Sequence, residues 1–176
     1  MAYVAPTTRA TGFLVTAAVW NQDVVNNVAF LANPPACRVR RTTDQTGIVT
    51  ATRTSILFDA ERYDTDTMHS TSTNTDRITI NTAGLYIVTG TVTFTNTNAT
   101  GYRLVDIELN GTTIIAEQSV GMRTDNYIVM NVTTMYKFAA ADFVKLVVYH
   151  TAGVNSSVLA QANFAPEFAA TWVGLG

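Results

Sequence analysis

The chain has few of the residues that hold a protein together by covalent or ionic bonds. Its single cysteine, Cys37, excludes a disulfide within the chain, and the surrounding ACRVRRT predicts a buried or half-buried residue rather than a reactive thiol. Charged residues make up 14% of the 176 residues, against about 25% in an ordinary soluble domain. Because so few charges cannot coat a small domain, we expect part of its apolar surface to meet another subunit.

Two classes of partner are disfavoured by what the sequence lacks. The eleven lysines and arginines are scattered and the net charge is -2, so the basic patch of a nucleic-acid-binding protein is missing. No apolar run reaches the length of about 18 residues that a transmembrane helix needs. The opening MAYVAPTTRA has neither a basic nor an apolar region of the kind found in a secretory signal peptide, so we expect none. We expect neither a nucleic acid nor a membrane as partner.

Residues 16–31 have the spacing of one amphipathic helix. Thr16 is a suitable N-cap, and Asn33 followed by two prolines is a suitable end. Four apolar residues fall on one helical stripe: Trp20, Val24, Val28 and Leu31. So short a helix cannot bury this stripe by itself, so it needs a partner in the same domain, a symmetry mate or another protein. We therefore expect residues 1–35 to form an extension with a docking helix.

The rest of the chain, residues 36–176, has the pattern of an all-β domain. Runs with a period of two, or continuously apolar, alternate with turn signals, and threonine and valine suit a pleated surface. The clearest hairpin is LNGTTI, in which Asn110 and Gly111 suit a type I′ turn. About ten short strands in this length predict an antiparallel jelly-roll sandwich, preceded by the one short helix.

Two of the expected strands, YIVMNVTTMY and FVKLVVY, are apolar on both faces. In an antiparallel sheet one face ordinarily meets water. We therefore expect one face to pack on the domain core and the other on a neighbouring subunit.

The order of several motifs resembles the jelly roll shared by the complement globular heads and the tumour necrosis factor superfamily. These motifs are ILFDAERYDT, DRITINTAGLYIVTGTVTF, DIELNGTTI, TTMYKFAAADFVKLVVYH and the terminal FAATWVG. The resemblance covers roughly residues 36–176 and implies a compact homotrimer packed about a three-fold axis. It departs from the family at Ala141, where a glycine is usual. We expect five aromatic residues in the core or at the trimer axis: Tyr86, Phe94, Tyr136, Tyr149 and Trp172.

The segment TGFLVTAAVWNQDVVNNVAFL resembles a short stretch near the amino termini of tailed-bacteriophage virion proteins. The alternative is an ordinary surface helix packed on its own domain. The resemblance implies a virion component whose partners are other capsid or tail proteins.

Few residues suggest chemistry. Four acidic residues could offer oxygen ligands to Ca²⁺ but lack the spacing of an EF-hand: Asp59, Glu61, Asp64 and Asp66. His69 and His150 lie in no metal-ligand or nucleophile spacing, so we expect exposed or capped side chains. Residues 65–76 are polar and predict an exposed loop, which either contacts a host glycan or is solvated. We expect no catalytic site and no cofactor.

These observations favour a structural protein on a phage particle, located in the virion as a capsid decoration, head fibre or tail-tip knob. It would be a trimer, attached through its amino-terminal segment, with a host-surface glycan as a further candidate partner. The alternative is a host-encoded carbohydrate- or protein-binding module of the same fold, and an enzyme is a distant third.

Overall fold

The structure is a computed structural model that describes residues 3–95, 100–121, 127–161 and 164–176. The chain divides into two compact units, residues 1–34 and 35–176.

The first unit contains one continuous helix with a π-helical middle. It comprises α1 (Ala17–Trp20), η1 (Asn21–Asn26) and α2 (Asn27–Ala32). Thr16 is the N-cap, as predicted, and its Oγ1 accepts a hydrogen bond from Val19 N at 3.4 Å. In an α-helix of about 3.6 residues per turn, residues spaced by four drift gradually around the helix axis. A π-helical turn holds more residues and so reduces this drift. The π segment therefore suits the i, i+4, i+8 spacing of the apolar stripe.

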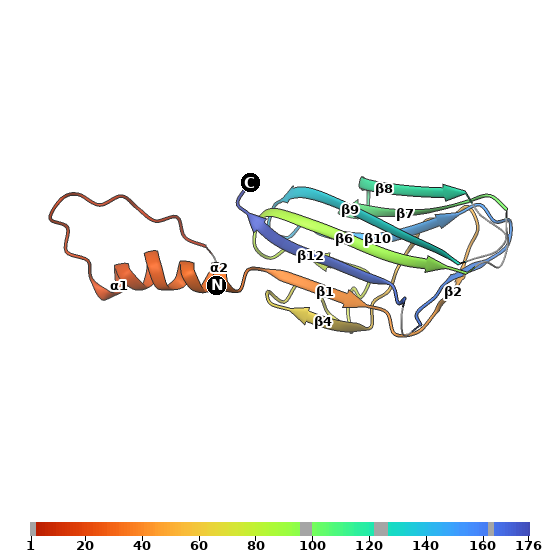
Figure 1. Ribbon diagram of the computed structural model, residues 1–176, viewed down its shortest axis with the longest axis horizontal. Helices are drawn as coiled ribbons and strands as arrows, with labels where there is room; N and C mark the ends of the chain where they lie inside the picture. Colours follow the sequence, from red (N-terminus) through yellow and green to blue (C-terminus); the bar gives the residue numbers. More distant parts are fainter. Residues whose placement is uncertain (1–2, 96–99, 122–126, 162–163) are drawn as a thin grey trace. The chain divides into compact units, whose positions relative to one another are not determined.

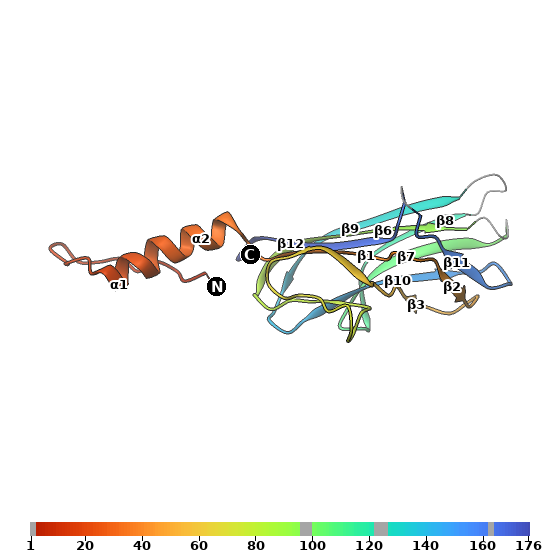
Figure 2. The same ribbon diagram turned by 90° about the horizontal axis from the view of Figure 1, so that it is seen from below.

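Residues 3–13 run back along this helix (Figures 1 and 2). The Asn27 side chain accepts from Val4 N at 3.0 Å and donates to Val4 O at 2.7 Å, as a paired strand would. Arg9 forms an ion pair with Asp23 at 2.9 Å. These contacts use the polar face of the helix, so the amino-terminal segment does not bind the apolar stripe.

The second unit is a sandwich of two antiparallel sheets. Its described residues form twelve strands: β1 Ala36–Arg40, β2 Gln45–Ile48, β3 Thr54–Ser55, β4 Ala60–Asp64, β5 Ile78–Thr79, β6 Gly84–Phe94, β7 Tyr102–Leu109, β8 Thr113–Gly121, β9 Ile128–Phe138, β10 Phe143–His150, β11 Ser156–Val158 and β12 Glu167–Gly174. Figure 1 shows β9, β6, β12, β1 and β4 side by side in the larger sheet, and Figure 2 shows β10 and β3 in the layer behind it.

The strand order is that of a jelly roll, which confirms the predicted fold class. Within the described residues the larger sheet runs β2-β11-β6-β12-β1-β4, with β9 also paired to β6, and the smaller runs β3-β10-β7-β8, with β5 also paired to β10. Many pairs join strands that are distant in sequence, as in β1 with β12. The two longest strands of the larger sheet, β6 and β9, pair over eleven residues.

The core lies between the sheets, where alternate residues of each strand meet. Tyr86, Val88 and Val92 of β6 are buried, whereas Ile87 and Thr89 are exposed. Gly84 begins β6 at φ +154°, and a Cβ there would overlap Trp172 Nε1, so only glycine allows this close approach. The predicted hairpin is confirmed, because Asn110 and Gly111 both have positive φ, 53° and 71°.

Three short strands were not predicted from the sequence as separate elements. They are β2, β4 and β11, which are three to five residues long. β4 has no buried residue, so its sequence shows no alternation of buried and exposed positions. Such strands are defined by pairing with neighbours rather than by their own pattern.

Candidate functional site

The outward face of the larger sheet is the most distinctive surface of the sandwich. Along its central strands the outward residues alternate with core residues, and they change character from one end of the sheet to the other. Where β6 begins they are mostly apolar, although β9 adds the exposed Lys137 there, and further along β6 they are threonines. The charged residues of this face lie beside these strands, on β1 and β4 and at the start of β12.

The apolar half of this face is built by β6, β9 and β12. Ile87 lies directly opposite Met135, and both are exposed, as is Val173 near the end of β12. At the boundary of this half the hydroxyls of Thr89 and Thr133 form a hydrogen bond at 2.9 Å. Exposed apolar side chains grouped on one sheet face favour burial against another surface.

The charged half forms a cleft of about 460 Å³, which we name the arginine cleft. Its cationic side chains are Arg38 and Arg40 of β1, Arg41 just beyond it, and Arg62 of β4. The carboxylate that lines it belongs to Glu167, at the start of β12.

Glu167 holds two of the arginines in place. Arg38 Nε donates to Glu167 Oε2 at 2.5 Å, and Arg62 Nε donates to Oε1 at 2.6 Å. Burial opposes the charge on Glu167, but the hydrogen bonds and charges of Arg62 and Arg38 outweigh it and lower the pKa of this carboxyl below its usual value. Glu167 is therefore ionised at neutral pH.

Sequence reasoning missed this cleft. Arg38 and Arg40 were visible as alternate residues of CRVRR, but Arg62 and Glu167 are brought to them only by the pairing of β4 and β12 with β1. A spacing of two in a strand is the local signal that both arginines share a face.

The four acidic residues proposed as calcium ligands do not form one cage. Asp59 accepts hydrogen bonds from Thr42, and Asp66 accepts one from Thr82 at 2.9 Å. Among the residues that the structure describes, no three acidic, histidine or cysteine side chains are arranged to hold a metal ion.

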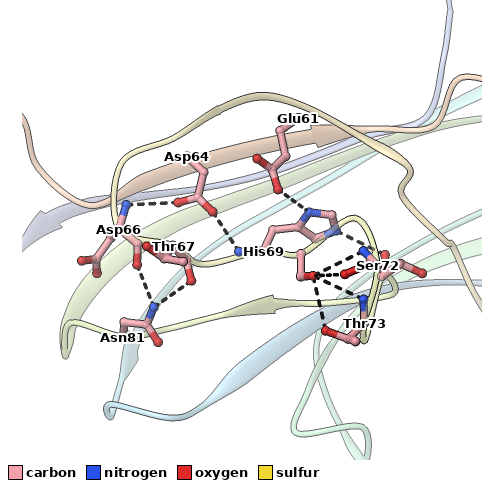
Figure 3. A network of polar contacts seen from close by, with 10 residues as sticks. Glu61, Asp64, Asp66, Thr67, His69, Ser72, Thr73 and Asn81 are labelled. Atoms are coloured by element: carbon pink, nitrogen blue, oxygen red, sulfur yellow. Dashed lines mark hydrogen bonds and ion pairs between the residues drawn. The ribbon is translucent and has the colours of Figure 1, made fainter.

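The same acidic residues instead organise the loop that follows β4 (Figure 3). Asp64 accepts from the backbone nitrogens of Asp66 at 3.1 Å and His69 at 2.9 Å. Glu61 Oε1 lies 3.0 Å from His69 Nδ1. The prediction of an exposed loop is therefore wrong at His69 and at Met68, both of which are buried. The local cause is Asp64, which binds the loop backbone, together with Glu61, which binds the His69 ring.

Neither histidine is exposed, and neither lies in a metal site within the described residues. The structure places His150 in the core beside Phe94, with ring centroids 6.3 Å apart. His150 Nε2 lies 2.9 Å from Ile48 O and therefore donates to it, while Nδ1 accepts from Ala152 N at 3.3 Å. Cys37 is also buried, and this burial, with the nearby charges of Asp64 and Glu61, raises the pKa of its thiol.

The five predicted aromatic residues fall into two groups. Tyr86, Phe94 and Trp172 are buried in the core, and the Tyr86 hydroxyl donates to Thr82 O at 2.7 Å. Tyr136 is exposed on β9, next to Phe138, and Tyr149 packs on Tyr102 at the outer face of the smaller sheet, 5.8 Å between ring centroids. Tyr86 faces the core, so the residues beside it on β6 that face outward are Leu85 and Ile87, neither of which is aromatic.

In the first unit the whole predicted stripe is exposed. None of its members, Trp20, Val24, Val28 and Leu31, is buried by the amino-terminal segment. No helix among the described residues has the length and apolar character to cross a membrane.

Comparison with known proteins gives the fold and no closer relationship. No protein-family model matches the chain, and no curated protein matches it. Among solved structures, the globular domain of zebrafish complement 1qA protein superposes with a TM-score of 0.60 at 12% identity, covering 81% of this chain and 99% of that one. Murine APRIL superposes with a TM-score of 0.57 at 11% identity, covering 78% and 98%. The second unit therefore has the jelly-roll fold of the complement globular heads and the tumour necrosis factor-like proteins.

Proposed function

We propose that this protein is a trimeric structural component of a bacteriophage virion, attached to the particle through its amino-terminal helix. It would act by binding rather than by catalysis, as a capsid decoration, a head fibre or a tail-tip knob. The observation that carries the proposal is the exposed apolar stripe on a unit distinct from the jelly roll.

The proposed trimer uses the apolar half of the larger sheet. Ile87, Met135 and Val173 are exposed there, although the chain has few charges to keep an apolar face in water. Burying them against neighbouring copies removes that exposed surface. The protein family that the sequence resembles forms compact trimers, and this supports the same arrangement here.

The proposed attachment uses the stripe Trp20, Val24, Val28 and Leu31. Burying each of these side chains contributes about 1.5 to 3 kcal/mol before the costs of ordering. Three copies in one trimer add avidity, so even a modest single contact becomes stable. The resemblance of residues 11–31 to segments of phage virion proteins supports a particle protein as the partner.

A host-encoded carbohydrate- or protein-binding module of the same fold is the second candidate. The arginine cleft favours it, because an exposed cluster of cations is typical of a binding surface. The two candidates differ in gene neighbourhood, since a virion protein lies among capsid, portal or tail genes.

The proposal is tested on particles. We expect sedimentation of the full chain to give three times its 19.1 kDa mass, and labelled antibody to decorate intact virions in electron micrographs. A monomer in solution would overturn the trimer, and unlabelled virions would overturn the location. Hydrolysis of any member of a polysaccharide panel by the purified protein would overturn the non-catalytic role.

A further inference from the structure

The arginine cleft concentrates cationic charge beyond what the fold requires. Four of the eleven lysines and arginines of a chain with net charge -2 line it, against one carboxylate. Behind them the sheet is held by ordinary buried residues, Cys37, Val39 and Phe168. Arg41 donates to Leu57 O and Asp44 O, so the cations that remain for a ligand are Arg38, Arg40 and Arg62. Like charges lining one cleft suit a ligand that carries negative charge.

The donors that remain available are held ready by Glu167. Arg38 and Arg62 each use Nε and Nη2 on that carboxylate, and their side chains are 47% and 46% exposed while Glu167 is 12% exposed. Within the described residues no partner contacts Nη1 of either arginine, or any guanidinium nitrogen of Arg40. Glu167 thus fixes both guanidinium groups beside the cleft and leaves the Nη1 of each available to a ligand.

The other walls of the cleft fit a sugar. Thr91 offers a hydroxyl, Gln161 an amide, and Val129 and Phe164 offer apolar surface for the C–H face of a ring. A cleft of about 460 Å³ lies in the range of small-ligand sites, roughly 300 to 1,000 Å³. A bare inorganic anion would use the arginines and leave these walls empty.

We propose that the arginine cleft binds an acidic saccharide, with the carboxylate or sulfate groups of the sugar on Arg40, Arg38 and Arg62. This inference gives the candidate host-surface contact of the proposed function a site and a ligand class. It does not depend on where the protein is located, because it concerns the jelly roll alone.

The test is calorimetric titration of the full chain with defined sugars. The probes are sialyllactose and a sulfated hexasaccharide, with lactose as the neutral control and sodium sulfate as the free anion. We expect both acidic sugars to bind, binding to weaken with added salt, and lactose not to bind. Failure of both acidic sugars to bind would overturn the proposal, as would competition by sodium sulfate at the concentration at which the sugars act.

Three variants separate a binding role from a structural one. Arg40→Gln removes a guanidinium that has no partner among the described residues, so it should weaken sugar binding about tenfold without lowering the melting temperature. Lys145→Gln removes the same charge from the smaller sheet and should leave binding unchanged. Glu167→Gln removes the charge that holds the guanidinium groups of Arg38 and Arg62 in place, so sugar binding should weaken although a negative charge is lost, which charge repulsion alone would not predict.

The variants also test the competing occupant of the cleft, a carboxylate from a second copy of this chain. If Arg40→Gln changes the sedimentation mass and leaves sugar binding unaltered, the cleft is a subunit contact and the proposal is wrong. If sugars bind as expected but virions carry no label, the saccharide site stands and the virion location fails.

Discussion

At the scale of single residues, the turn before β10 contains a strained alanine. Ala141 has φ +72°, in the left-handed region, and occupies the position where the resembling family has glycine. An alanine there costs about 1 to 2 kcal/mol, whereas a glycine costs about 0.4 to 1 kcal/mol of chain entropy in the unfolded state. The turn is kept because Ala141 N donates to Ile80 O at 2.8 Å and Asp142 accepts from Ala139 N at 2.8 Å.

We therefore predict that Ala141→Gly stabilises the jelly roll by about 0.5 to 1 kcal/mol. Thermal or urea unfolding measures it. Ala140→Gly is the matched control, since Ala140 is exposed in the same turn and does not have positive φ, and it should destabilise slightly. Equal destabilisation by both substitutions would show that the backbone at Ala141 is not strained.

A second prediction concerns the buried His150. Burial, together with the charge of Arg103, lowers its pKa and outweighs the opposing hydrogen bond to Ile48 O. The neutral ring satisfies both of its nitrogens, whereas the unfolded chain binds a proton near pH 6.5. The stability from this group is thus complete above pH 6.5 and is lost as the pH falls below it.

We expect unfolding free energy to fall between pH 7.5 and pH 5.5, by at most about 1.4 kcal/mol per pH unit from this residue. His150→Gln keeps a donor for Ile48 O and cannot titrate, so its stability should depend less on pH. Identical pH profiles for the two proteins, compared by chemical denaturation, would contradict the assignment.

At the scale of elements, long strands and the helix, whose residues alternate regularly between apolar and polar, were predictable from the sequence. Short strands, which are defined by pairing with their neighbours, were not. The helix cap at Thr16, the strands β6, β9 and β10, and the turn at Asn110 each carry their signal locally. β4 and the arginine cleft depend on residues more than twenty positions apart, and no local pattern encodes that pairing. The calcium interpretation failed for the same reason, because proximity in sequence did not show that each carboxylate binds a different backbone or side-chain group.

The first unit leads to a prediction about independence. Its helix and amino-terminal segment bind each other through Asn27, Asp23 and Phe30, and the jelly roll has its own core. A chain starting at Pro35 should therefore fold and trimerise with a melting temperature close to that of the full chain, yet fail to join particles. Trp20→Ala should weaken incorporation with little effect on melting.

Calorimetry and a particle-binding assay measure these effects. If removal of residues 1–34 prevents folding, the helix belongs to the core of the jelly roll and is not a docking element. If the shortened chain joins particles as well as the full chain, the attachment surface lies on the jelly roll.

At the scale of the whole molecule, one sheet face is divided between two uses. Its apolar half, with Ile87 and Met135, suits burial against other copies, and its charged half forms the arginine cleft. The boundary is the hydrogen-bonded pair of Thr89 and Thr133. A trimer that buries the apolar half can leave the charged half open, because Ile87 and Met135 lie on β6 and β9, whereas the arginines lie on and beside β1 and β4.

The last prediction tests this division by placing a charge in the apolar half. Ile87→Glu puts a carboxylate on a surface that the trimer buries, and leaving it there unpaired costs several kcal/mol per subunit. Ile114→Glu is the matched control, because Ile114 lies on the smaller sheet with 42% exposure against 38% for Ile87. We expect sedimentation to find monomers for Ile87→Glu and trimers for Ile114→Glu, with both retaining the β-sheet spectrum in circular dichroism. A trimer that survives Ile87→Glu would place the subunit contact elsewhere on the sandwich, whereas loss of the trimer in both variants would mean that the smaller sheet takes part in the contact.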